Sequence, residues 1–139
     1  MPDEVFLSHS SEDDEFAAHL AHVLRQHGVP TWHSRRNIVG AQQWHDEIGD
    51  ALRRCDWFCV VLSPSSVESM WVKRETLYAL EQERYQNRIV PILLGDCDYE
   101  KLSWVLSSLQ MVDFRHDFRD GCRELFRVWD KVFEGQNGG

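Results

Sequence analysis

Short apolar runs alternate with longer amphipathic stretches along the whole chain. Five runs have the length of a strand, namely residues 5–7, 30–32, 57–62, 89–94 and 111–114. Four stretches repeat apolar residues at helical spacing, over about residues 13–27, 44–54, 70–86 and 120–133. Strands and helices in alternation are typical of a parallel sheet with helices on both faces. The pattern predicts an α/β domain built on an open sheet of five parallel strands.

Individual residues refine this prediction. Residues 57–62 are continuously apolar, which is typical of a strand covered on both faces and places it in the middle of the sheet. Pro91 removes one backbone donor from its strand, which favours a sheet edge or a bulge. Gly28 suits the positive φ that ends many helices, and Ser10 or Ser11 is expected to cap the first helix.

Length and composition indicate one packed domain. The chain has 139 residues, with 42% hydrophobic and 27% charged residues, as in ordinary globular proteins. The domain is expected over residues 1–134, and the glycine-rich residues 135–139 are expected to form a flexible tail or linker. The four cysteines, at positions 55, 59, 97 and 122, show no CxxC spacing, so buried free thiols are expected.

The charge balance limits the partners. A formal net charge of −8 repels polyanions, so nucleic acid and anionic membranes are not expected as partners. No segment approaches the roughly 18 apolar residues of a membrane span, and the first apolar run is too short for a signal peptide. A cytoplasmic location is therefore expected.

The fold predicts where a ligand would bind. In an open parallel sheet, the site lies beyond the carboxyl ends of the strands, near the point where strand order reverses. This places residues 8–11, 33–43 and 63–75 around one crevice. Residues 34–43 form a long connection that contains Arg35, Arg36 and Gly40, and connections of this length are usually functional or mobile.

Trp71 and Glu75 are the most specific pair in this crevice. They lie four residues apart at the start of a predicted helix, so both side chains face one side. An aromatic plate beside a carboxylate suits a sugar that carries a flat, cationic base. A pyridinium base leaves as a neutral molecule, so one carboxylate suffices where most glycosidases need two. The alternative is that Trp71 packs in the core and Glu75 faces water or a lysine.

Other kinds of site fit the sequence less well. His19 and His22 lie three residues apart on a helix, but they lack a third ligand, so no metal site and no cofactor are expected. Glycine-rich phosphate loops, a GxSxG elbow and an HExxH motif are absent from the sequence. A phospho-acceptor site like that of response-regulator receiver domains would need acidic residues at the ends of the first and third strands, where residues 8–9 and 63–64 are Ser-His and Ser-Pro.

Four segments in a fixed order carry a family resemblance. They read FLSHSSED at residues 6–13, Gly40 with Trp44, VLSP at residues 61–64, and SMWVKRE at residues 69–75. Together they resemble the Toll/interleukin-1 receptor (TIR) domain family, over about residues 4–134. The resemblance implies a flavodoxin-like α/β fold, an open sheet of five parallel strands flanked by helices on both faces.

The resemblance also implies roles for residues. Residues 34–43 match the family's BB loop, which takes part in assembly and here contains Arg35, Arg36 and Gly40. Glu75 matches the catalytic glutamate of enzymatic members, and Trp71 matches an aromatic residue that influences whether the product cyclises. The remaining positions expected to bind substrate are Ser8, His9, Ser10 and Trp44.

Two functions follow from the resemblance. Enzymatic TIR domains split NAD⁺ into nicotinamide and ADP-ribose or a cyclic ADP-ribose, and the Trp71 and Glu75 pair resembles this branch, which is common in bacterial immune and stress proteins. NAD⁺ is then the substrate and other TIR domains are the partners. The alternative is a non-catalytic module that signals by assembling with other TIR domains. Because no basic residue follows the first strand, phosphate binding is expected to use serine hydroxyls, helix amides, or Arg35 and Arg36.

Overall fold

The computed structural model describes residues 1–33 and 41–135, without the side chains of residues 41–44. Five strands form one sheet in the order β2-β1-β3-β4-β5, and every neighbouring pair is parallel. The strands are β1 (Val5–Ser8), β2 (Thr31–His33), β3 (Trp57–Leu62), β4 (Ile89–Leu93) and β5 (Val112–Asp113). The predicted parallel α/β fold is confirmed.

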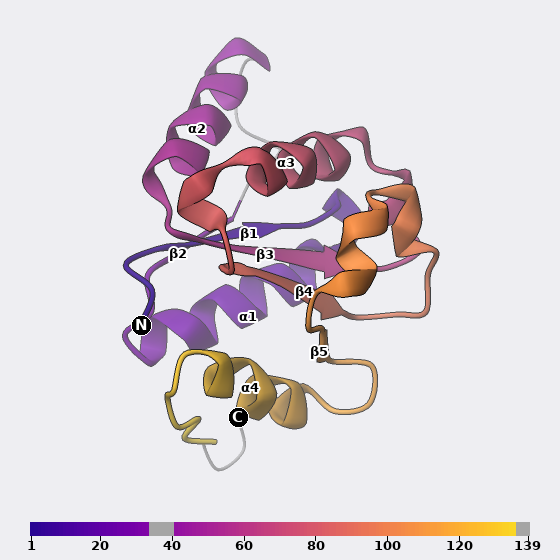
Figure 1. Ribbon diagram of the computed structural model, residues 1–139. Coiled ribbons are helices and arrows are strands. Elements are labelled where there is room, and N and C mark those ends of the chain that lie inside the picture. The colour runs from indigo at the N-terminus through magenta and orange to yellow at the C-terminus, as the bar shows by residue number, and fades with distance from the viewer. Residues whose placement is uncertain (34–40, 136–139) are drawn as a thin grey trace.

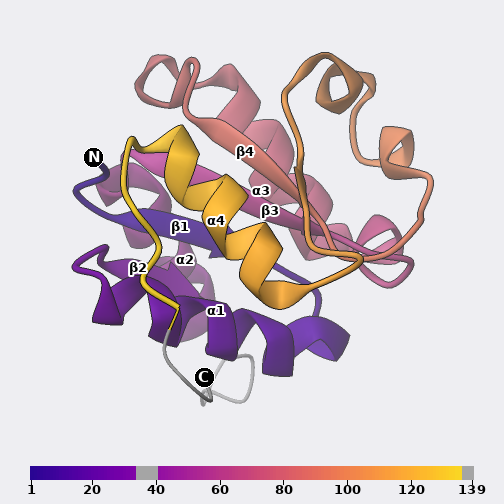
Figure 2. The same ribbon diagram turned by 90° about the horizontal axis from the view of Figure 1, so that it is seen from below.

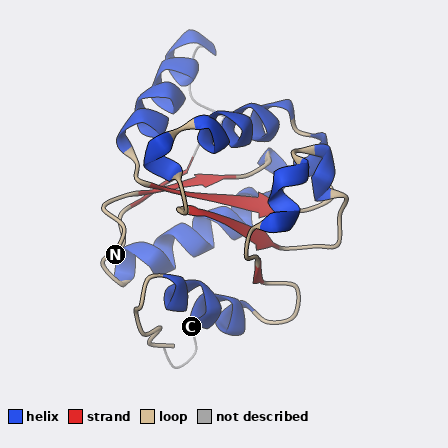
Figure 3. Cartoon of the chain, in the orientation of Figure 1, coloured by secondary structure: helices blue, strands red, loops and turns tan. Residues whose placement is uncertain are grey.

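Helices cover both faces of the sheet. The α-helices are α1 (Asp14–Gln26), α2 (Ala41–Arg54), α3 (Met70–Glu81) and α4 (Phe118–Val128). Short 3₁₀ turns are η1 (Ser11–Asp13), η2 (Ser66–Glu68), η3 (Glu83–Tyr85), η4 (Tyr99–Lys101) and η5 (Trp104–Ser108). In Figure 1, α2 and α3 lie above the sheet and α1 and α4 lie below it. Figure 2 shows α1 and α4 from below, and Figure 3 shows the strands enclosed between the two helical layers.

The alternation of side chains along each strand builds two cores. In β1, Val5 and Leu7 pack with α1 and α4, whereas Phe6 packs with α2 and α3. In β3, Cys59 and Val61 join the first core, and the alternate residues join the second. Successive side chains point to opposite faces of a strand, so a strand between two helical layers must be apolar on both. The predicted central position of β3 is confirmed.

Pro91 marks neither of the two predicted features, a sheet edge or a bulge: β4 lies between β3 and β5, and its register with β3 is continuous through Pro91. The amide of Leu94 bonds to Leu62 of β3 at 2.9 Å. Because donors alternate in direction along a parallel strand, the nitrogen of Pro91 faces the β5 side. Pairing with β5 begins only at Ile92. The absence of an amide proton at Pro91 therefore costs no hydrogen bond between β4 and β5.

Three helix boundaries differ from prediction by three residues or more. Helix α3 ends at Glu81 rather than near residue 86, because Gln82 is extended and the hydroxyl of buried Tyr85 donates to the Leu52 carbonyl. Helix α2 begins at Ala41, three residues early. Helix α4 ends at Val128 instead of 133, followed by a positive φ of 54° at residue 130. At the end of α3, the contact of one side chain across the core decides the boundary, and periodicity does not report such a contact.

The start of α1 also differs from prediction. Neither Ser10 nor Ser11 caps it: the N-cap is Asp13, and η1 precedes the helix. The Ser10 hydroxyl bonds to Asp13 and Ser65 instead. At the other end, Gly28 has a φ of 80°, which confirms the predicted helix stop.

The cysteines are free, as expected, but not all are buried. Cys55, Cys59 and Cys122 are buried, whereas Cys97 is half-buried. Burial raises the pKa of both the Cys55 and Cys122 thiols to about 12. Among the described residues, none of the helices combines the length and apolarity required to span a bilayer.

Candidate functional site

The candidate site lies at the carboxyl ends of β1 and β3. At these strands the strand order reverses, because the chain adds strands first on one side of β1 and then on the other. After β1, the chain adds β2 on one side and β3 on the other. Ser8 ends β1, and Ser63 follows β3. In open parallel sheets, this reversal leaves a crevice in which ligands bind. Residues of α3 lie above these strand ends on one face of the sheet (Figure 1).

Glu75 is buried at this position. Its exposed fraction is 3%, and the Ser8 hydroxyl donates to its Oε1 at 2.6 Å, although the two residues are 67 positions apart in sequence. The distance is typical of a hydrogen bond to an ionised carboxylate. Ser69 caps α3 by accepting from the amide of Val72, which places Glu75 in the second turn of the helix. Glu75 therefore does not face bulk water, and a buried carboxylate is costly unless partners or function retain it.

A cavity of about 270 Å³ opens beside Glu75, between α2 and α3. Its lining residues are His45, Ile48, Gly49, Leu52, Arg53, Trp71, Arg74, Glu75 and Tyr78. Trp71 and Glu75 line the same cavity, as their spacing predicts. Trp71 is half-buried, and the Arg74 guanidinium carbon lies 5.3 Å from its ring centroid. The cavity thus combines an aromatic wall, which attracts a flat cationic group, with a buried carboxylate.

The serines beyond β1 and β3 form a separate cluster on Asp13. The Asp13 carboxylate accepts hydrogen bonds from Ser10 at 3.0 Å, from Ser65 at 3.2 Å, and from Ser63. The Ser10 and Ser65 oxygens also lie 2.7 Å apart, so one of the two hydroxyls shares its proton between this bond and Asp13. These bonds tie the start of α1 to the loop after β3. The Ser10 hydroxyl is therefore bonded to a carboxylate. A phosphate that approached Ser10 would be repelled by the negative charge of Asp13.

His9 lies on the α1 and β2 side of the crevice and is 2% exposed. Its Nδ1 is 2.8 Å from the Ser10 carbonyl oxygen, and its Nε2 is 3.9 Å from Oδ1 of Asp14. The His33 ring, at the end of β2, has its centroid 5.8 Å from that of His9. His9 and His33 thus bring the ends of β1 and β2 together beside the start of α1.

The remaining predicted positions are only partly covered. Arg35, Arg36 and Gly40 lie outside the described residues, and so does the side chain of Trp44, whose backbone is in α2. Sequence reasoning missed Tyr78 as a lining residue. Its position three residues after Glu75 places it on the same helical face, so the spacing rule that paired Trp71 with Glu75 also predicts Tyr78.

Comparisons with known proteins show the family to which the fold belongs. A family model described as TIR domain matches residues 5–126. The 2' cyclic ADP-D-ribose synthase AbTIR of Acinetobacter baumannii is 33% identical over 73 residues, which cover 52% of this chain and 27% of the relative. The corresponding synthase BtTIR of Bacteroides thetaiotaomicron is 26% identical over 88 residues, or 63% of this chain and 31% of the relative.

An animal protein and two solved structures extend the comparison. The stimulator of interferon genes protein of Magallana gigas is 26% identical over 118 residues, 83% of this chain and 28% of the relative. The chain thus spans about a third or less of the length of these relatives. The TIR domain of the Toll-related receptor TRR-2 of Hydra magnipapillata has a TM-score of 0.72 at 22% identity, covering 91% of this chain and 98% of that one. A prokaryotic SEFIR domain has a TM-score of 0.69 at 21% identity, covering 99% and 98%. At this identity the two structures support the fold alone.

Proposed function

The chain belongs to the TIR domain family, and from this premise we propose that it cleaves the bond between nicotinamide and ribose in NAD⁺, with Glu75 as the catalytic carboxylate. The products are nicotinamide and ADP-ribose or a cyclic ADP-ribose. The observation that carries the proposal is the buried Glu75 carboxylate, bonded to Ser8 and lining a cavity with Trp71. Microbial relatives named 2' cyclic ADP-D-ribose synthases support the choice of NAD⁺.

The proposed chemistry needs a single carboxylate. When the bond between ribose C1′ and the pyridinium nitrogen breaks, its electron pair leaves with nicotinamide, which becomes neutral. Positive charge then develops on the ribose ring. A fixed negative charge beside the ring stabilises this transition state more than the ground state, and so accelerates the reaction. Water then adds to C1′ to give ADP-ribose, or a hydroxyl of the same molecule adds to give the cyclic product, and either releases a proton.

The cavity suits the reacting end of the dinucleotide. At about 270 Å³ it lies just below the usual range for ligand pockets, roughly 300–1,000 Å³. The nicotinamide and its ribose fit such a volume better than the whole dinucleotide does. We assign Trp71 to the ring of the base and Glu75 to the ribose. A role in immune or stress signalling, with other TIR domains as partners, follows from the same proposal.

One observation favours the second candidate, a TIR module that acts by assembly alone. Asp13 places a carboxylate among the serines after β1 and β3, where the dinucleotide phosphates would approach. Negative charge at this position weakens anion binding. An interaction module has no such conflict, since it binds no dinucleotide. Both candidates predict self-association, so assembly does not distinguish them.

Nicotinamide release distinguishes the two candidates. Purified protein at high concentration, with and without a crowding agent, is incubated with NAD⁺, and nicotinamide and the ADP-ribose products are separated by chromatography. We expect release that increases more than in proportion to protein concentration, because a neighbouring copy completes the site. Absence of release from protein shown to be assembled by light scattering would instead favour the interaction module.

Ser8 is expected to act as a positioning residue for Glu75. Ser8→Ala removes the 2.6 Å hydrogen bond to Oε1, and a bond to a charged group contributes about 1.5–3 kcal/mol. We therefore expect kcat for nicotinamide release to fall about 10-fold or more, with little change in KM. Ser8→Thr keeps the hydroxyl and should recover much of kcat. A purely structural role would instead lower the unfolding midpoint of Ser8→Ala and leave kcat per folded molecule unchanged.

A further inference from the structure

Three potential metal ligands from separate elements meet beside the crevice. His9 follows β1, His33 ends β2, and Asp14 begins α1. One ligand atom from each lies within 4.8 Å of the other two. Both histidines are buried, with exposed fractions of 2% and 8%, while the Asp14 side chain is 57% exposed. The described part of the chain thus brings together two buried imidazoles and one exposed carboxylate.

The hydrogen bond of His9 sets which ring nitrogen carries the lone pair. Nδ1 lies 2.8 Å from the Ser10 carbonyl oxygen. A carbonyl only accepts, so Nδ1 carries the proton, and in the neutral ring the lone pair is on Nε2. Nε2 is the atom that faces Asp14, at 3.9 Å. Histidine ligands of metals usually donate their second ring N–H to a carbonyl or carboxylate in this way, which fixes the tautomer and the ring orientation.

We propose that His9, His33 and Asp14 bind a divalent first-row transition metal ion, with Zn²⁺ as its representative. Imidazole nitrogens select such ions over Mg²⁺ and Ca²⁺, which prefer oxygen ligands. In a tetrahedral zinc site with bonds near 2.0–2.2 Å, the ligand atoms are about 3.3–3.6 Å apart. The 3.9 Å between His9 and Asp14 is close to this value, and a rotation of the exposed Asp14 side chain on binding the ion would supply the difference. Water supplies the remaining coordination.

The surrounding charge also attracts a cation. The chain has a net charge of −8, and residues 12–15 read Glu-Asp-Asp-Glu at the start of α1. Clustered negative charge raises the local concentration of cations. The Asp13 carboxylate is engaged by the serine hydroxyls, whereas Asp14 is directed toward His9. The proposed ion binding does not depend on NAD⁺ cleavage, so either proposal can fail without the other.

Metal titration tests the proposal directly. The metal-free protein is titrated with Zn²⁺ in a calorimeter, and with Co²⁺ while the visible d–d absorption of the bound ion is recorded. We expect one saturable site whose Co²⁺ spectrum shows a low-symmetry, four- or five-coordinate ion. His33→Gln and Asp14→Asn should each weaken binding by at least about 10-fold, since each removes a ligand. Circular dichroism and thermal unfolding establish that each variant is folded, and the exposed position of Asp14 makes its variant informative even if His33→Gln unfolds.

His22→Gln is the matched control. His22 is exposed and belongs to the His19 and His22 pair on α1, three residues apart, which is the site that adventitious metal would use. This variant should bind Zn²⁺ and Co²⁺ as the unaltered protein does. The proposal is overturned if no saturable binding occurs, if Asp14→Asn binds with unchanged affinity, or if His22→Gln loses the binding.

Discussion

Replacement of Glu75 by glutamine is expected to abolish nicotinamide release from NAD⁺ while the protein stays folded. Glutamine keeps the size of the side chain, and its carbonyl oxygen still accepts the hydrogen bond from Ser8. The substitution removes only the negative charge that stabilises the developing positive charge on ribose. Removal of one preorganised electrostatic group typically costs 10²–10³-fold in kcat, so we expect a loss of at least about 100-fold.

Stability should change in the opposite direction from activity. Glu75 is 3% exposed, and a carboxylate at such a position loses hydration that glutamine does not need. The unfolding midpoint of Glu75→Gln should therefore equal or exceed that of the unaltered protein, as is common when a functional group is neutralised. A fall in activity accompanied by unfolding would give no support to a catalytic role, so both quantities are measured on the same sample.

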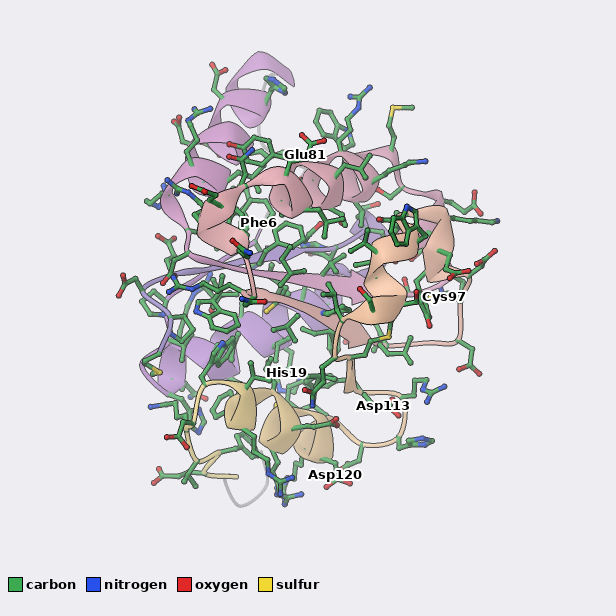
Figure 4. All side chains as sticks on the ribbon, in the orientation of Figure 1. Phe6, His19, Glu81, Cys97, Asp113 and Asp120 are labelled. Atoms are coloured by element: carbon green, nitrogen blue, oxygen red, sulfur yellow. The ribbon has the colours of Figure 1, made fainter. Side chains whose placement is uncertain are left out.

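Glu81→Gln serves as the matched control, because Glu81 lies on the same helix and is exposed. Figure 4 labels Glu81 on α3, and it does not line the cavity beside Glu75. This variant should release nicotinamide at the unaltered rate. If Glu75→Gln retains full NAD⁺ cleavage, the proposed mechanism is wrong. If both variants lose activity, general charge rather than the position of Glu75 controls the rate.

Gly121→Ala is expected to destabilise the protein by about 1–3 kcal/mol, the usual cost of overpacking a core. Helix propensity alone predicts the reverse, since alanine in a helix is favoured over glycine by about 1 kcal/mol. A Cβ at position 121 in α4 would, however, lie 2.4–2.6 Å from ring carbons of Phe114. That ring is 5% exposed and packs edge-on against Phe16 and Phe118, so it has no space to move.

Gly49→Ala is the matched control for this prediction. Gly49 also lies within a helix, α2, but a Cβ there meets only the guanidinium of Arg53 at 3.3 Å, the end of a flexible side chain. We expect Gly49→Ala to stabilise the protein by about 0.5–1 kcal/mol. Thermal and urea unfolding of both variants give the two free energies. A rise in stability for Gly121→Ala would show that α4 shifts away from Phe114 at little cost.

The parallel sheet and its central strand followed from short-range patterns. Continuous apolar character over residues 57–62 reports burial on both faces, and β3 has the bounds that this pattern predicts. The helix stop at Gly28 depends on the φ of one residue, which is why one residue type predicts it. The same reasoning failed where a long-range contact intervenes. Periodicity predicts that α3 continues through Tyr85, but the Tyr85 hydroxyl bonds to the Leu52 carbonyl across the core, and α3 ends before this residue.

The candidate site also has one part that local spacing predicted and another part that it did not. The shared face of Trp71 and Glu75 depends on the pitch of one helix, so their spacing alone predicted that they line one cavity. The contacts of Glu75 with other elements cannot be predicted from spacing along one helix. Ser8 and Glu75 are 67 positions apart, and they meet only because α3 packs over the end of β1.

The sequence by itself therefore determined the kind of fold, the middle of the sheet, and the pairing of Trp71 with Glu75, because each depends on neighbours within a few turns or a single strand. Only the tertiary structure decided that Ser8 holds Glu75, that Asp13 collects the serines, and that His9, His33 and Asp14 converge. The physical reason is that a parallel sheet brings the carboxyl ends of β1, β2 and β3 to one edge. Side chains remote in sequence meet there with distances and burial that no local pattern contains.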